Sequence, residues 1–129
     1  MIILPIKKKW FDMILSGEKK EEYRDIKPFY ARRIGKYLRN RYTRVLRDFS
    51  TDHIVDVLFR NGYAGDSPEF WAECEVTIGT GKTEWGAEEG KLYYVLTIVK
   101  ITNLPPIRYR TFEQPTVFDG KWEVTEASE

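Results

Sequence analysis

Side chains suited to acid–base or phosphate chemistry are concentrated in one short stretch, from Gly17 to Arg24. If this stretch is a strand, its side chains repeat every two residues, so Glu22 and Arg24 lie on the same side. A turn before the strand can bring Lys19 across to them. An arginine held by a glutamate is a stiff fork that fits a phosphate or the edge of a base. The alternative is an ion-paired strand end without chemistry.

Lys19 is a candidate base under one condition only. A carboxylate nearby favours the charged form of an amine, and a charged amine is a poor base. Catalysis by Lys19 therefore requires burial that lowers its pKa against the pull of Glu22.

Other catalytic motifs are incomplete. Before Gly81-Lys82-Thr83, a phosphate-binding loop needs a glycine at the position that Val76 occupies. His53 is the only histidine, and the one cysteine, Cys74, can form neither an internal disulfide nor a cysteine-based zinc site. We therefore expect no metal and no cofactor, and we expect Cys74 to be buried in a strand.

Short strands and two short helices must position the Gly17–Arg24 stretch. The hydrophobic pattern predicts strands over residues 2–6, 19–24, 53–59, 70–78 and 91–101, and helices over 7–16 and from Pro28 onward. Gly17 stands where a left-handed residue ends the first helix. Residues 41–47 fit either a continued helix or a loop. Together these elements predict a small α+β domain around a curved or barrel-like sheet.

The length and the composition limit the classes of protein to which the chain can belong. The chain has 129 residues, 42% of them hydrophobic, which suits one domain with a packed core. No apolar stretch is long enough for a membrane span, and the first residues lack the order of charges of a secretory signal. We expect a soluble, cytoplasmic protein that does not associate with membranes.

The charge distribution is uneven although the net charge is only +1. Residues 1–50 carry 14 Lys and Arg against 6 Asp and Glu, and most of this excess lies between Lys27 and Arg47. A basic stripe of this kind is typical of a surface that meets phosphates. A solvated helix face, paired with the acidic second half of the chain, explains it equally well.

Four positions of the stretch also match a known family pattern. Gly17, Lys19, Glu22 and Arg24 fit G-x-K-x-x-E-x-R, and the chain resembles the ASCH domain family, in particular its small stand-alone bacterial and phage members. The resemblance extends over residues 2–101 and includes the segments 4–7, 11–16, 59–63 and 93–96.

This resemblance implies a fold and a ligand class. The implied fold is a small PUA-like β-barrel with two or more short helices at its rim, formed by residues 1–104. Residues 105–129 are expected to be an irregular extension packed on the same domain. The implied ligand is RNA or a modified nucleoside, held in a cleft. The residues expected to contact it are Lys19, Lys20, Tyr23, Arg24, Arg60, Asn61 and Tyr63, and Trp85 is a further candidate for stacking on a base.

Two alternatives remain open. Some small ASCH members hydrolyse N4-acylated cytidine with a lysine, a threonine and a distant glutamate, and others are linked to RNA cleavage. Here Lys19 matches the lysine, Glu22 stands in place of the threonine, and Glu84 or Glu88 is the nearest match for the distant acid. The other alternative is an interaction domain whose basic helix docks on an acidic partner.

Overall fold

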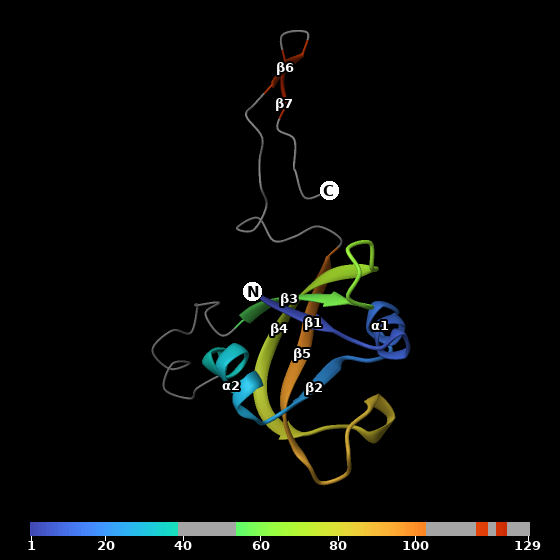
Figure 1. Cartoon of the computed structure of the whole chain (residues 1–129), viewed down its shortest axis with the longest axis vertical. Helices are drawn as coiled ribbons and strands as arrows, with labels where there is room; N and C mark the ends of the chain where they lie inside the picture. Colours follow the sequence, from blue (N-terminus) through green and yellow to red (C-terminus); the bar gives the residue numbers. More distant parts are fainter. Residues whose placement is uncertain (39–53, 103–115, 119–120, 124–129) are drawn as a thin grey trace.

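In the computed structural model, residues 1–38, 54–102, 116–118 and 121–123 can be described. Five strands form one curled sheet, open on one side like half of a barrel, in the order β1-β3-β4-β5-β2 (Figure 1). The strands are β1 (Ile2–Pro5), β2 (Glu21–Asp25), β3 (Ile54–Arg60), β4 (Glu69–Thr80) and β5 (Leu92–Thr102). Only β1 and β3 pair in parallel; the other neighbours are antiparallel.

The two short helices follow from local sequence. Helix α1 (Lys8–Leu15) buries Phe11 and Ile14, which lie three residues apart on one face. Gly17 follows the helix with a φ of +86°, a conformation that costs a side-chain-bearing residue energy, and turns the chain toward β2. Helix α2 (Pro28–Arg33) begins at a proline, whose missing N–H costs nothing in a first turn.

The hydrophobic core fills the concave side of the sheet. Alternate residues of β3 and β4 point into it, and both helical segments close over it (Figure 1). Its members include Val57, Phe59, Cys74 and Leu96 from the sheet and Phe11 from α1. Cys74 is completely buried, as expected, and burial raises the pKa of its thiol.

The predicted α+β class and the barrel-like curvature are confirmed, and the boundaries differ in detail. The second helical segment ends at Arg33 and continues as a short 3₁₀ turn, η1 (Gly35–Tyr37). A second 3₁₀ turn, η2 (Thr83–Trp85), lies in the glycine-rich connection between β4 and β5. None of the described helices is long and apolar enough to cross a membrane.

The C-terminal part is not wholly irregular, contrary to the expectation for residues 105–129. Strands β6 (Thr116–Phe118) and β7 (Lys121–Glu123) pair antiparallel as a separate two-stranded sheet, and β-branched and aromatic residues such as Val117 and Trp122 favour strands. The expected packing of this extension on the domain lies outside the described residues. The same holds for residues 41–47 and for His53.

Candidate functional site

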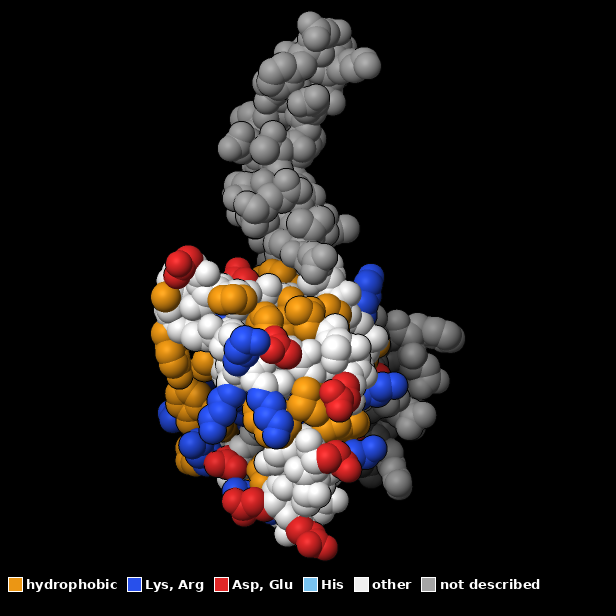
Figure 2. Space-filling model, turned by 90° about the vertical axis from the view of Figure 1, so that its right-hand side faces the viewer, with side chains coloured by type: hydrophobic (Ala, Val, Ile, Leu, Met, Phe, Trp, Pro, Cys, Tyr) orange, Lys and Arg blue, Asp and Glu red, His pale blue; other side chains and the backbone are white. Residues whose placement is uncertain are grey.

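A cavity of about 530 Å³ opens beside the edge strand β2. Three parts of the chain surround it: the end of β1 with the start of α1, the strand β2 with the start of α2, and the segment from η2 to the start of β5. The lining residues used below are Lys7, Trp10, Glu22, Tyr23, Arg24, Asp25, Lys27, Tyr30, Trp85, Gly86, Glu88, Lys91 and Tyr93. Figure 2 shows Lys and Arg side chains gathered beside hydrophobic ones on one face of the molecule.

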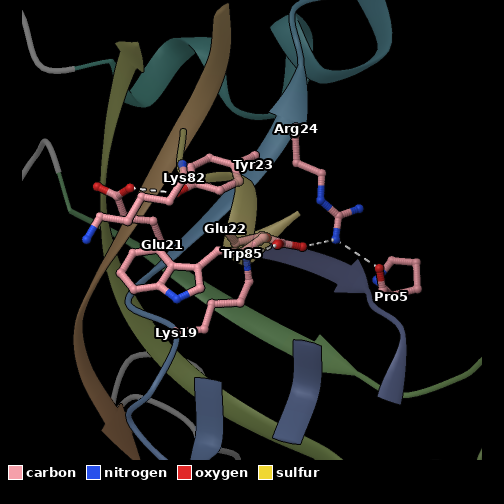
Figure 3. Close-up of polar contacts among 8 residues, drawn as sticks. All are labelled: Pro5, Lys19, Glu21, Glu22, Tyr23, Arg24, Lys82 and Trp85. Atoms are coloured by element: carbon pink, nitrogen blue, oxygen red, sulfur yellow. Dashed lines mark hydrogen bonds and ion pairs between the residues drawn. The ribbon is translucent and has the colours of Figure 1, made fainter. Parts of the chain in front are cut away.

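Glu22 is the centre of a buried ion-pair network (Figure 3). Its Oε1 lies 3.3 Å from Nζ of Lys19, and its Oε2 lies 2.7 Å from Nη2 of Arg24. Only 9% of the Glu22 side chain is exposed. The three charged side chains therefore converge, because the strand period puts Glu22 and Arg24 on one side and the turn after Gly17 brings Lys19 to them.

Arg24 also connects the two edge strands of the sheet, β2 and β1. Its Nη2 donates to the backbone carbonyl oxygen of Pro5 at 2.9 Å, and its Nη1 donates to the hydroxyl of Tyr30 at 3.2 Å. Burial works to lower the pKa of the guanidinium, but the Glu22 carboxylate and these hydrogen-bond partners outweigh it, so the pKa is raised. Arg24 is a permanent cation, held in one orientation at the edge of the cavity.

Lys19 lies beneath the cavity wall rather than in the cavity. Its side chain is 0% exposed, and its Nζ donates to the backbone carbonyl oxygen of Trp85 at 2.6 Å. The same nitrogen lies 5.0 Å from the ring centre of Trp10 and 4.8 Å from that of Tyr23. Burial lowers the pKa of Lys19 and prevails over Glu22, which acts to raise it.

The segment that carries Trp85 is fastened by two tyrosine hydroxyls as well. The Tyr23 hydroxyl accepts from the backbone N–H of Lys82 at 3.0 Å and donates to Glu21 at 2.7 Å (Figure 3). The Tyr93 hydroxyl accepts from the backbone N–H of Glu88 at 2.9 Å. This wall of the cavity is therefore held by side chains of β2 and β5.

Five aromatic side chains are among the residues that line the cavity. They are Trp10, Tyr23, Tyr30, Trp85 and Tyr93. The rings of Tyr23 and Tyr93 pack at 5.6 Å between centres. Since every nucleobase has a π-face, rings of this kind bind bases with little dependence on sequence.

The residues expected at the site divide into two groups. Glu22, Tyr23, Arg24 and the stacking candidate Trp85 line the cavity, and Lys19 contacts four of its lining residues from below. The cavity lining does not include Lys20, Arg60, Asn61, Tyr63 or Glu84.

These five residues have other surroundings. Arg60 pairs with Glu69 and donates to the carbonyl of Ala64, and Tyr63 is 87% exposed. Lys20 and Glu84 are both exposed. Of the two glutamates considered as a distant acid, Glu88 lines the cavity. Any role for the residues outside the lining stays a prediction.

Sequence reasoning did not name Trp10, Tyr30 or Tyr93 as lining residues, and it placed Lys27 only in the basic stripe. Trp10 has the spacing of a core residue on α1, and Lys27 and Tyr30 belong to a basic stretch without a motif. The sequence shows only that position 86 is glycine, and the structure gives the reason: Gly86 has a φ of +99°, and a Cβ added there would lie 2.9 Å from the Trp10 ring. A glycine required by close approach of an aromatic ring marks a tightly built wall.

Within the described residues, no cluster of three or more His, Cys, Asp and Glu side chains is placed to hold a metal ion. The chain matches no family model, no curated protein and no solved structure. The geometry of the cavity is therefore the basis for assigning a function.

Proposed function

We propose that this chain is an ASCH-like domain with a PUA-like fold that binds RNA or a modified nucleoside in the cavity beside β2. One observation carries the proposal: a cavity of about 530 Å³ combines five aromatic side chains with the oriented guanidinium of Arg24. The volume lies in the range of small-molecule sites, about 300–1,000 Å³. We propose that the domain acts in the cytoplasm, where RNA and modified nucleosides are present.

The aromatic side chains support a base as the ligand. Unstacked bases in single-stranded RNA are recognised by stacking on aromatic side chains and by hydrogen bonds to their edges. Each stacked base contributes about 1–3 kcal/mol by alanine substitution. Trp85 is the best placed for this role among the residues that sequence reasoning named, because it lines the cavity on a wall that Lys19 holds in position.

Arg24 supports recognition of an anion or a base edge. Its bonds to Glu22, Pro5 and Tyr30 orient the guanidinium before any ligand arrives, so less conformational entropy is lost on binding. Charge-assisted hydrogen bonds from such a group are about twice as strong as neutral ones.

A hydrolase that uses Lys19 is the second candidate, and the lowered pKa of Lys19 favours it. A neutral amine can take a proton from water or attack an acyl carbon, and Glu22 is within reach to carry the proton. However, the amine has no exposed surface and already donates to Trp85, so a substrate reaches it only if this wall moves. Binding is therefore the function that the geometry supports better.

The test compares ligand binding by two aromatic variants. Titration of single-stranded RNA and of nucleosides, including N4-acetylcytidine, is expected to give binding that Trp85→Ala weakens about tenfold. Tyr63→Ala is the matched control, because Tyr63 is exposed outside the cavity. Equal affinities for both variants and the natural chain would contradict the proposal. Mass spectrometry of the same mixtures detects hydrolysis, which the second candidate requires Lys19→Met to abolish.

A further inference from the structure

Some of the charged side chains around the cavity form ion pairs, and others do not. Lys91 Nζ pairs with Asp25 Oδ1 at 3.0 Å, and Glu22 lies between Lys19 and Arg24. Three more charged residues line the cavity, namely Lys7, Lys27 and Glu88. None of these three forms an ion pair with another residue of the described ranges.

Of the two remaining lysines, Lys27 lies near Arg24. Lys27 Nζ is 5.3 Å from the centre of the Tyr30 ring, and the Tyr30 hydroxyl accepts a hydrogen bond from Arg24. On the other side, Arg24 donates to the carbonyl of Pro5, two residues before Lys7. The Lys27 ammonium and the Arg24 guanidinium therefore belong to one end of the cavity, and Lys7 is a further lining cation.

Arg24 retains hydrogen-bonding capacity at this end. A guanidinium has five N–H donors, and the bonds to Glu22, Pro5 and Tyr30 take three of them. Two donors are left for a ligand, as far as the described residues go. Its side chain is 13% exposed, which is enough for one edge to meet a ligand.

The opposite end of the cavity is aromatic. In Figure 3, Trp85 and Tyr23 lie on one side of Glu22, and Arg24 with Pro5 lies on the other. Tyr93 packs against Tyr23 and so belongs to the aromatic end. Lys91 also lies at this end, 5.1 Å from the centre of the Tyr93 ring, but its charge is paired with Asp25. The Lys27 ammonium, at the Arg24 end, has no such carboxylate partner among the described residues.

From this arrangement we propose that the ligand unit is a nucleoside phosphate, whose phosphate meets Arg24 and Lys27 while its base lies against Trp85. This inference rests on the proposed function and narrows it from nucleosides in general to phosphorylated ones. A phosphate fits because it accepts several charge-assisted hydrogen bonds and neutralises a cation, Lys27, that has no carboxylate partner among the described residues.

The test is isothermal titration calorimetry of the full chain with four sets of probes. They are the four ribonucleosides and N4-acetylcytidine, their 5′- and 3′-monophosphates, inorganic phosphate, and a short single-stranded RNA. At least one monophosphate is expected to bind about tenfold or more tightly than its nucleoside. Lys27→Gln is expected to remove most of that difference, and the exposed position of Lys27 leaves the fold intact, which circular dichroism checks.

Lys20→Gln is the matched control, since Lys20 is an exposed lysine on the approach to β2 that does not line the cavity. An equal loss in both variants would show an effect of net charge alone and overturn the inference. Equal affinities for nucleosides and their monophosphates would overturn it while leaving the proposed function standing. So would binding of the RNA without binding of any mononucleotide. If no base-containing probe binds, the proposed function itself is contradicted. If inorganic phosphate binds as tightly as any nucleotide, the inferred contact between the base and the aromatic side chains is contradicted.

Discussion

Lys19 donates a hydrogen bond of 2.6 Å to the backbone carbonyl oxygen of Trp85, which lies 66 residues further along the chain. The same amine lies 3.3 Å from Glu22. One buried side chain thus connects the turn after α1, the edge strand β2 and the wall of the cavity. This makes Lys19 a residue on which both the stability of the fold and the shape of the site depend.

Replacing Lys19 should destabilise the protein strongly. Lys19→Met keeps the length of the side chain but leaves Glu22 with one cationic partner and the Trp85 carbonyl without its donor. We expect a loss of about 3 kcal/mol in the free energy of unfolding, since breaking a buried pair leaves a charge uncompensated. Urea unfolding measures it, and Lys20→Met, at the exposed neighbouring position, should stay within about 0.5 kcal/mol of the natural chain.

The contribution of Lys19 to stability should depend on pH. Because its pKa is lower in the folded protein than the ordinary 10.5, the unfolded chain binds more protons between these two values. Stability from this group therefore rises as the pH increases through the folded pKa toward 10.5. The difference in unfolding free energy between the natural chain and Lys19→Met should grow over this range. A difference that is constant or shrinks up to about pH 10 would contradict the lowered pKa.

Arg24 should not be replaceable by lysine. Arg24→Lys keeps the charge but cannot hold Glu22, the Pro5 carbonyl and the Tyr30 hydroxyl together, because an ammonium lacks the planar fork. We expect a loss of about 1–3 kcal/mol in stability, together with weaker ligand binding. Thermal unfolding and calorimetry measure the two effects. Arg32→Lys, at an exposed position on α2, is the control, and equal effects would argue against a special role for Arg24.

A pair of glycine variants tests how tightly the Trp85 wall is built. Gly86 and Gly90 have φ values of +99° and +76°, so alanine is strained at both. Only at Gly86 does the added Cβ meet another group, the Trp10 ring at 2.9 Å, whereas nothing lies within 4 Å at Gly90. Gly86→Ala should cost about 1–3 kcal/mol more than Gly90→Ala in urea unfolding, because overpacking adds to the backbone strain. Equal costs would mean that the Trp10 contact is not tight.

Binding of single-stranded RNA should weaken steeply with salt if the cations near the cavity meet phosphates. Each neutralised phosphate contributes a slope of about −0.7 to the dependence of log affinity on log salt concentration. Fluorescence titrations between low and physiological salt measure this slope. Removal of one phosphate contact by Lys27→Gln should reduce it by about that amount. A slope near zero would argue against phosphate contacts altogether.

Much of the fold could be predicted because it depends on short-range patterns. Alternating apolar residues indicated β3, β4 and β5, helical spacing indicated α1, and Gly17 marked its end. The same strand period predicted that Glu22 and Arg24 share one side. Each of these features depends on steric preferences within a few residues, and contacts with distant segments do not change them here.

The boundaries of the site could not be predicted in this way. Trp10 has the spacing of a core residue, and Arg60 and Tyr63 were expected at the site only as an implication of the resemblance. Their separation into cavity and surroundings depends on how the curled sheet brings β1, β2 and the Trp85 segment together. The local sequence pattern carries no information about the distances between these segments.

Residue order alone thus accounts for the charged triad of Lys19, Glu22 and Arg24, because a turn and a strand suffice to gather it. Long-range packing set the environment of each member: it buried the Lys19 amine under Trp85 and left one edge of Arg24 facing the cavity. The physical reason is that charge and spacing are local properties, whereas desolvation depends on atoms from every segment packed around a group.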